Sequence, residues 1–548
     1  MKIALAQINY HIGNFGGNTS KIIAALQRAK QAGADLAVFA ELAVSGYPPR
    51  DFLEFGDFIN RCDASVDEIA AHCHGIAAIV GAPTRRAEIK GKDLHNSALF
   101  LAEGKVMAMA HKALLPNYDV FDEYRYFEPC REFSVIEYGG RRIALTICED
   151  IWDVGDDPLY TISPMDELCR QSPDLMINIA ASPFHYEQAQ QRREVMLANV
   201  KRYGLPLFYV NHVGAQTELL FDGGSMAVAP AGFVFDEMKY FEEDLRVYDL
   251  DALTAAGKPP VSIPDEPAAK TALIHDALVM GIRNYFEKLG FTKAILGLSG
   301  GIDSAVTMVL AARALGAGNV HALLLPSAFS SDHSVKDALQ LAENLGSPYE
   351  IINIEAAYNS LRESLEKPFD GLPFDVTEEN MQARVRAVIL MAMSNKFGYI
   401  LLNTSNKSEA AVGYTTLYGD MNGGISVLGD VYKTEVYRLA EYINRDAEVI
   451  PRNTIVKPPS AELRPGQHDS DSLPDYGILD SLLYQYIEKR KGPRELLAMG
   501  FDQAMVSRVL KMVNTSEYKR YQTPPILRVS PKAFGMGRRM PIVGRYLS

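Results

Sequence analysis

The sequence predicts an α/β protein built from two large domains, and three observations support this. Short apolar runs alternate with helical patterns along the whole chain, which is typical of strand–helix–strand units. The 548 residues are too many for one small domain, since a domain holds roughly 100–200 residues. Residues 253–270 are rich in proline, alanine and charge, as an exposed linker is. We therefore expect domains at 1–252 and 271–548.

The first domain combines two kinds of strand connection. Helical patterns at 19–32 and 188–203 separate some strands, whereas other strands follow one another directly, as in hairpins. This mixture predicts a mixed sheet or a sandwich. The expected strands are 2–8, 35–40, 77–83, 97–102, 105–111, 141–148, 174–180 and 206–213.

The second domain begins with a pattern that is typical of a doubly wound parallel sheet. A helix at 271–288 with an apolar stripe precedes the strand 294–298, a glycine-rich turn and the helix 305–315. This order opens a Rossmann-like sheet. Later strands are expected at 321–326, 349–354 and 399–404.

Composition restricts the classes of partner and compartment. A net charge of -13 argues against a nucleic-acid-binding surface spread over the protein. No apolar run approaches the ~20 residues of a membrane span, and the first apolar run is too short for a signal peptide. The five cysteines are odd in number and form no CxxC pair, which favours a reducing compartment. We expect a cytoplasmic protein without nucleic-acid or membrane partners.

Three reactive side chains, Glu41, Lys112 and Cys148, each stand at the end of an expected strand. Strand ends of an α/β sheet bring side chains from distant segments together. These three suit amide cleavage, in which a thiolate attacks, a carboxylate moves protons and an ammonium stabilises the oxyanion. By spacing alone, a buried structural cysteine is the more common interpretation.

The surrounding segments favour catalysis. AELAVSGYPPRDFL, HKALLPNYDVFDEYRYF and ICEDIW resemble, in this order, the three catalytic segments of the nitrilase, or carbon–nitrogen hydrolase, superfamily. The resemblance covers roughly residues 1–250 and implies an αββα sandwich. It implies that Glu41 is the general base, Lys112 the oxyanion stabiliser and Cys148 the nucleophile, with Glu123 as a supporting carboxylate. It further implies glutamine contacts at Tyr118, Ser182 and Gln188.

The turn SGGIDS at 299–304 predicts an anion-binding loop. Gly300 and Gly301 let the backbone approach an anion closely, and the following helix directs its N–H groups to the same place. Asp303 can hold Mg²⁺ against phosphates. The loop lacks the GK[ST] of a Walker A motif. GLSGG also matches a hydrolase nucleophile elbow, but no later histidine has a persuasive context.

The loop resembles that of the N-type ATP pyrophosphatases, and most of 270–548 resembles NAD synthetases. The resembling segments are PSAFSSDHSVKDALQLAENLG, ENMQARVRAVILMAMSNKFGYILLNTSNKSEAAVGYTTLYGDM and KPPSAELRPGQHDSDSLPDY. The resemblance implies a deamido-NAD site at Asn380, Glu409, Lys433 and Lys519, with Asp303 and Glu409 as metal ligands. The implied ATP contacts are Gly297, Leu298, Ser299, Gly300, Gly301, Ile302, Asp303, Ser304 and Thr404.

Together the two halves resemble glutamine-dependent NAD synthetases. Other enzymes with this loop fit less well, because sulfurtransferases need a cysteine in the ATP domain and asparagine synthetases need one at the N-terminus. The resemblance implies that glutamine supplies ammonia, that ATP with Mg²⁺ adenylates deamido-NAD, and that the chain forms a homo-oligomer. Two alternatives remain: an ATP-dependent ligase for another carboxylate, and a non-catalytic nitrilase-like module on an ammonia-fed synthetase.

Overall fold

The computed structural model describes residues 1–87, 91–155, 158–260 and 269–544. The chain divides into two compact units, Met1–Pro267 and Ala268–Ser548. Helix α5 (Leu250–Ala255) occupies the first residues of the predicted linker, and residues 261–268 of that linker lie outside the described part. Among the described residues, every helix is too short or too polar to cross a lipid bilayer.

The N-terminal unit contains two six-stranded sheets, in the orders β14-β1-β2-β3-β4-β5 and β13-β12-β9-β8-β7-β6. A separate hairpin is formed by β10 and β11. Strands β1, β2 and β3 are parallel, as are β7, β8 and β9, and the remaining strands extend each sheet by antiparallel pairing. The bounds are β1 Lys2–Gln7, β2 Leu36–Val38, β3 Ala77–Arg85, β4 Leu94–Ala102, β5 Lys105–His111, β6 Ile136–Tyr138, β7 Arg141–Ile147, β8 Leu175–Ile179, β9 Leu207–Val210, β10 Val213–Gln216, β11 Leu219–Asp222, β12 Met226–Ala229, β13 Phe233–Glu237 and β14 Asp244–Asp249.

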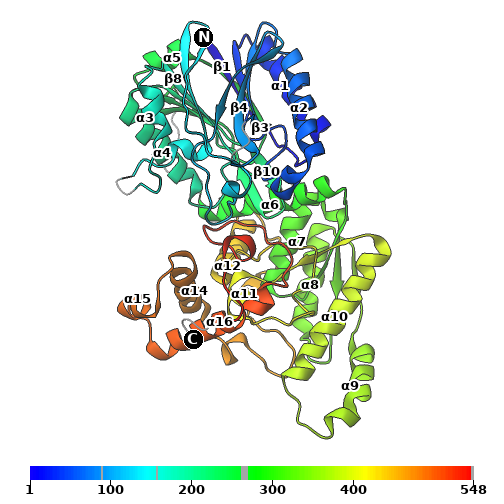
Figure 1. Ribbon diagram of the computed structural model, residues 1–548. Coiled ribbons are helices and arrows are strands. Elements are labelled where there is room, and N and C mark those ends of the chain that lie inside the picture. Colours follow the sequence, from blue (N-terminus) through cyan, green and yellow to red (C-terminus); the bar gives the residue numbers. More distant parts are fainter. Residues whose placement is uncertain (88–90, 156–157, 261–268, 545–548) are drawn as a thin grey trace. The chain divides into compact units, whose positions relative to one another are not determined.

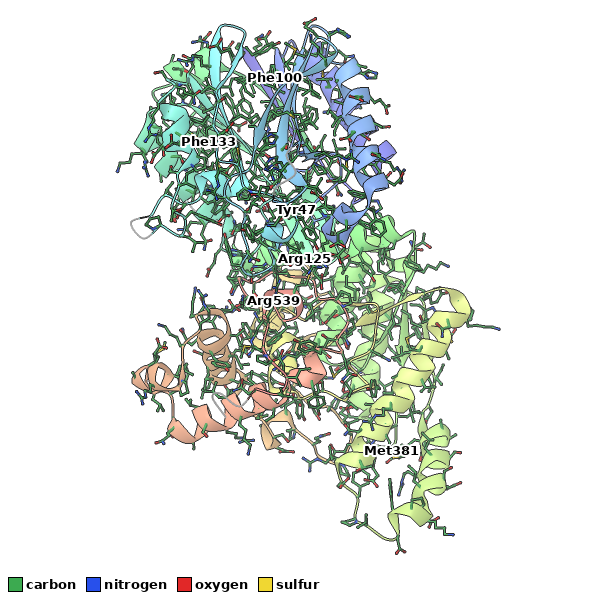
Figure 2. All side chains as sticks on the ribbon, viewed as in Figure 1. Tyr47, Phe100, Arg125, Phe133, Met381 and Arg539 are labelled. Atoms are coloured by element: carbon green, nitrogen blue, oxygen red, sulfur yellow. The ribbon has the colours of Figure 1, made fainter. Side chains whose placement is uncertain are left out.

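Helices cover the outer face of each sheet, so that this unit has four layers (Figure 1). Helices α1 (Phe15–Gln31) and α2 (Gly56–Ala71) pack on the first sheet, and α3 (Pro164–Cys169) and α4 (Gln188–Tyr203) pack on the second. Apolar side chains from both sheets form one continuous core, and Phe100 on β4 marks it in Figure 2. The αββα sandwich implied by the sequence resemblance is therefore confirmed.

The C-terminal unit is built on a parallel sheet in the order β17-β16-β15-β18-β19. Strand order reverses between β15 (Ala294–Gly297) and β18 (Ile400–Asn403). The carboxyl ends of strands at such a switch point form the usual ligand crevice of a doubly wound sheet. The remaining strands are β16 Val320–Leu324, β17 Tyr349–Ile351 and β19 Ile425–Ser426.

Helices lie on both sides of this sheet, which confirms the predicted doubly wound fold. Helix α7 follows β15 and α8 follows β16, whereas α10 packs on β15 and β18 from the face that includes Met381 (Figure 2). A second apolar cluster is formed largely by helices near the end of the chain. The bounds are α6 Lys270–Leu289, α7 Ile302–Leu315, α8 Asp332–Leu345, α9 Glu355–Phe369, α10 Val376–Phe397, α11 Lys407–Val412, α12 Lys433–Ile443, α13 Arg452–Val456, α14 Tyr476–Leu483, α15 Pro493–Ala498, α16 Gln503–Thr515 and α17 Glu517–Arg520.

Candidate active sites

The N-terminal site is centred on the ammonium of Lys112, which is fully buried. Its Nζ donates to Glu41 Oε1 at 2.7 Å and to a carboxylate oxygen of Glu123 at 2.8 Å. Burial by itself would lower the pKa of Lys112, but Glu123 and Glu41 raise it well above its ordinary value. Lys112 is therefore a permanent cation shared by two carboxyl groups.

Glu41 is held by three donors. Its Oε1 accepts from Asn96 Nδ2 at 2.6 Å as well as from Lys112, and its Oε2 accepts from the backbone N–H of Ala181 at 2.8 Å. A Cβ on Gly81 of β3 would lie 2.3 Å from Leu42 N and 2.7 Å from the Glu41 carbonyl carbon. Only glycine leaves room there for the backbone that carries Glu41.

Glu123 completes the charged group around Lys112. Tyr47, which Figure 2 labels, donates its hydroxyl to Glu123 Oε1 at 2.9 Å. Burial raises the pKa of Glu123; Lys112 opposes this shift, and Glu41 adds to it. Glu123 therefore lies beside a second acidic side chain as well as beside the ammonium of Lys112.

Cys148 directly follows β7 and begins a tight turn. Its φ is 43°, which is strained for a residue with a side chain and is typical of positions held in place for function. Burial raises the pKa of the Cys148 thiol well above its usual value, Glu41 raises it further and Lys112 opposes the shift. The resting cysteine is therefore a neutral thiol, with a carboxylate and an ammonium acting on it.

Asp150 joins the segments that carry Lys112 and Cys148. Its carboxylate accepts from Ala113 N at 3.0 Å, Leu114 N at 2.9 Å and Ile147 N at 3.0 Å. The first two lie just after Lys112, and Ile147 lies just before Cys148, so one side chain links the ends of β5 and β7. Burial raises the pKa of Asp150 to about 7, although these N–H groups lower it.

The three predicted glutamine contacts fall into two hydrogen-bonded groups. Gln188 Nε2 donates to Ser182 Oγ at 2.9 Å, and both residues are buried. The Tyr118 hydroxyl donates to Glu149 Oε1 at 2.7 Å, and the Tyr160 hydroxyl donates to the same oxygen at 3.1 Å. Glu149, the neighbour of Cys148, is thus a buried carboxylate held by two neutral hydroxyl groups; burial raises its pKa, while Tyr118 and Lys112 lower it.

In the C-terminal unit, the SGGIDS turn connects β15 to α7 at the switch point of the sheet. Gly300 has a φ of +80°, and a Cβ there would lie 2.2 Å from Ser334 O. Ser304 Oγ donates to Gly301 O at 3.0 Å, and Gly301 N donates to Ser299 Oγ at 3.2 Å. These contacts leave the turn compact, with the first N–H groups of α7 at its end.

A buried lysine joins the two carboxylates that the resemblance assigns to the metal. Lys433 Nζ donates to Asp303 Oδ2 at 2.5 Å and to Glu409 Oε1 at 3.4 Å. Burial raises the pKa of Glu409 to about 8; Lys433 opposes this shift and Asp303 adds to it. Two acidic side chains therefore share one ammonium at this position.

A metal at this position needs ligands from outside the protein. Among the described residues, no group of three or more histidine, cysteine or acidic side chains is arranged to hold a metal. Mg²⁺ is commonly bound by one or two carboxylates together with substrate phosphates. Asp303 and Glu409 fit that arrangement.

The other predicted nucleotide contacts, Asn380, Thr404 and Lys519, come from three separate segments. Thr404 directly follows β18, and Asn380 on α10 accepts from Thr416 Oγ1 at 2.7 Å. Lys519 Nζ donates to Gly413 O at 2.8 Å and to Thr415 O at 2.7 Å. Asn380 and Lys519 therefore meet at the segment 413–416, which follows α11, and they do not contact the Asp303 group through the bonds described above.

Several residues of these sites were not predicted from the sequence. In the first unit they are Tyr47, Asn96, Glu149 and Asp150, and in the second Asn406, whose side chain contacts Asp303. Glu149 and Asp150 stand in the quoted segment ICEDIW, so their position beside the nucleophile was an available signal. Tyr47 likewise stands in the quoted segment AELAVSGYPPRDFL. Asn96 carried no such signal, because only the fold brings it to Glu41.

Comparison with known proteins agrees with this geometry. Residues 2–258 match the carbon–nitrogen hydrolase family, and residues 274–523 match NAD synthase. The chain is 43% identical to glutamine-dependent NAD(+) synthetase from Synechocystis, and the match covers 98% of each chain. The chain belongs to the glutamine-dependent NAD(+) synthetase family.

Two further members of the family resemble this chain over nearly its whole length. The enzyme of Thermotoga maritima is 39% identical, over 100% of this chain and 99% of its own. A solved structure of the Acinetobacter baumannii enzyme in complex with ADP has a TM-score of 0.77 and 38% identity, covering 99% of this chain and 98% of that chain. Both halves of the family architecture are thus present here in one polypeptide.

The SGGIDS turn allows a stability prediction with a matched control. Gly300→Ala places an alanine at positive φ and pushes its Cβ into Ser334 O, whereas Gly346→Ala, with a φ of +68°, meets nothing within 4 Å. We expect Gly346→Ala to cost about 1–2 kcal/mol for the left-handed backbone. Gly300→Ala should cost at least about 2 kcal/mol more, because the backbone must shift. Denaturant unfolding of both variants measures this, and equal losses would show that the turn yields without strain.

Proposed function

We propose that this chain synthesises NAD from deamido-NAD with glutamine as nitrogen donor and ATP as energy source. We assign glutamine hydrolysis to residues 1–252 and ATP-dependent amidation to residues 271–548, with 253–270 as the linker. The observation that carries the proposal is that one chain of this family holds both the buried Glu41–Lys112–Cys148 group and a pyrophosphatase loop whose Asp303 is paired with Lys433. The five free cysteines support a reducing compartment, the cytoplasm.

At the first site, the thiol of Cys148 attacks the carboxamide carbon of glutamine while Glu41 takes the thiol proton. The ammonium of Lys112 lies where the oxyanion develops and stabilises it. Glu41 returns the proton to the leaving nitrogen, which departs as ammonia and leaves a thioester. Glu41 then deprotonates a water molecule, and attack of that water on the thioester releases glutamate and restores the thiol.

The substrate contacts around Cys148 fit the two ends of glutamine. Tyr118, Ser182 and Gln188 supply neutral donors and acceptors, and we add Glu149 to this set. Glutamine carries an α-ammonium, and Glu149 is a buried carboxylate whose hydrogen-bond partners in the protein are hydroxyl groups. A buried charge gains most from an ionic partner. Glu149 therefore serves as the recognition group for the α-ammonium.

At the second site, backbone N–H groups of the SGGIDS turn and of α7 hold the pyrophosphate part of ATP. The turn comprises Gly297, Leu298 and residues 299–304, and Thr404 contributes from the end of β18. The nicotinate carboxylate of deamido-NAD attacks the α-phosphorus and pyrophosphate leaves. Ammonia then attacks the acyl adenylate, AMP departs, and the amide of NAD remains after loss of a proton.

Charge neutralisation is the main contribution of the protein to this second step. Asp303 and Glu409 would hold Mg²⁺, which when bound neutralises charge on the phosphates. Lys433 lies beside both carboxylates and supplies a cation to the leaving pyrophosphate. The groups assigned to deamido-NAD are Asn380 and Lys519, at the segment that follows α11, together with Glu409 on α11 and Lys433 on α12.

Cys148→Ala tests the assignment of the two half-reactions. Glutamine hydrolysis and glutamine-dependent NAD formation should fall by more than about 1,000-fold, as expected for loss of a catalytic nucleophile. NAD formation from ammonium should persist, because the second unit contains no cysteine. Cys169→Ala, a half-buried cysteine on α3, is the matched control and should retain both reactions. Glutamine-dependent synthesis by a Cys148→Ala enzyme would disprove the nucleophile assignment.

Glu149→Gln tests recognition of the α-ammonium. The change keeps the shape and the hydroxyl contacts but removes the charge, so the KM for glutamine should rise roughly 10- to 100-fold. Hydrolysis of glutaramate, which has the same amide and carboxylate but lacks the amino group, should change little. If both substrates lost activity equally, Glu149 would act on the structure of the site and not on the ammonium. Ammonium-dependent synthesis reports that the second unit remains intact.

We also propose that the chain is a homo-oligomer that associates through α10. One face of this helix is exposed although it carries Val388, Met391 and Ala392 at helical spacing; Val388 is 70% exposed. Contiguous exposed apolar side chains of this kind mark association surfaces.

Val388→Asp should therefore lower the molar mass measured by light scattering after gel filtration. A charge in the centre of an apolar interface is unpaired and desolvated there. Val543→Asp places the same charge on a valine that is 93% exposed near the C-terminus, and it should leave the mass unchanged. An unchanged mass in the Val388→Asp protein would remove α10 from the interface.

A further inference from the structure

Asn406 is a fully buried side chain between the two carboxylates assigned to the metal. It is the N-cap of α11: its Oδ1 accepts from Glu409 N at 3.0 Å, and its backbone N–H lies 3.4 Å from Glu409 Oε2. This reciprocal pair is a capping box, and it holds the Glu409 side chain back toward the start of the helix.

The other end of the same amide reaches the SGGIDS turn. Asn406 Nδ2 donates to Asp303 Oδ1 at 2.9 Å, while Lys433 donates to Asp303 Oδ2 at 2.5 Å. Both oxygens of Asp303 thus have a fixed donor, which sets the plane of the carboxylate. Since each carboxylate oxygen has a second lone pair, the oxygens can still accept a cation from one defined direction.

Asn406 therefore joins segments that are 103 residues apart in sequence. Asp303 is carried by the first turn of α7, and Glu409 by the first turn of α11. Serine or aspartate can cap a helix as asparagine does, but aspartate cannot donate to Asp303, and serine is too short to cap Glu409 N and also reach across to Asp303. Of these three residues, only asparagine can cap α11 and also donate a hydrogen bond to Asp303.

We infer that Asn406 is a positioning residue for the second half-reaction: it orients Asp303 relative to Glu409 so that both carboxylates face one metal ion. The inference rests on the proposed metal role of Asp303 and Glu409. It does not make Asn406 a ligand, because both of its polar atoms are already used within the protein. A cap needed only for α11 would predict a loss of stability, whereas a positioning residue predicts weaker metal binding in a stable protein.

Two substitutions of Asn406 separate these roles. Asn406→Ser keeps a capping oxygen and loses the donor to Asp303, and Asn406→Ala loses both. Mn²⁺ serves as the probe, and its binding in the presence of ATP is measured by electron paramagnetic resonance, with thermal unfolding measured in parallel. We expect both variants to bind Mn²⁺ about tenfold more weakly, as for loss of one hydrogen bond to a charged group. Only Asn406→Ala should unfold at a lower temperature.

Two control variants distinguish a failure of the positioning role from a failure of the metal assignment. Asn444→Ser removes an asparagine that also makes bonds through both ends of its amide, at the C-terminus of α12, and it should bind Mn²⁺ normally. Asp303→Asn should lose Mn²⁺ binding. If Asp303→Asn does so while Asn406→Ser binds normally, the positioning role is wrong and the metal assignment stands. If Asp303→Asn binds Mn²⁺ normally, the metal assignment itself is wrong. Glutamine hydrolysis should be retained in the Asn406→Ser and Asn444→Ser variants.

Discussion

The first unit depends on one buried ammonium. Lys112 is fully enclosed and shares its charge between Glu41 and Glu123. Burying three charged groups is costly unless each of their polar atoms has a hydrogen-bond or ionic partner. Tyr47, Asn96 and the N–H of Ala181 supply the missing hydrogen bonds. The ends of strands from both sheets must therefore be aligned for these buried charges to have partners. The same alignment brings Cys148 close enough for Glu41 and Lys112 to affect the pKa of its thiol.

The second unit also has a buried ammonium that two acidic side chains share, but its surroundings differ. Lys433 also lies between two acidic side chains, which are carried by the first turns of α7 and α11, and burial raises the pKa of Glu409 to about 8. In the first unit the ammonium completes a closed group that acts on a thiol. In the second it joins the two acidic side chains that we propose to hold a metal beside the phosphates of ATP. The difference follows from chemistry, because amide hydrolysis requires a proton carrier and adenylation requires charge neutralisation.

Single side chains that join distant segments are common to both units. Asp150 holds the backbone after Lys112 and before Cys148, and Asn406 holds Asp303 and the first turn of α11. Neither was predicted as functional from the sequence, since neither performs chemistry. The short strands β10, β11 and β12 were also not predicted, since runs of four residues show only a weak period. The predicted strand 206–213 ends at Val210 instead, where Asn211 turns to hold Ser182.

The sequence by itself determined the fold class of each half and the order of the longer strands, and it singled out Glu41, Lys112, Cys148 and Asp303 as candidate reactive residues. Apolar periodicity is a local property, and reactive residues inside family segments can be read in order along the chain. Only the tertiary structure decided which oxygen of Glu41 faces Lys112 and that Glu149 is a buried carboxylate. It also decided that Lys433 donates to one oxygen of Asp303 and Asn406 to the other. These are contacts between segments up to 130 residues apart, and they exist only once burial forces each polar group to find a partner.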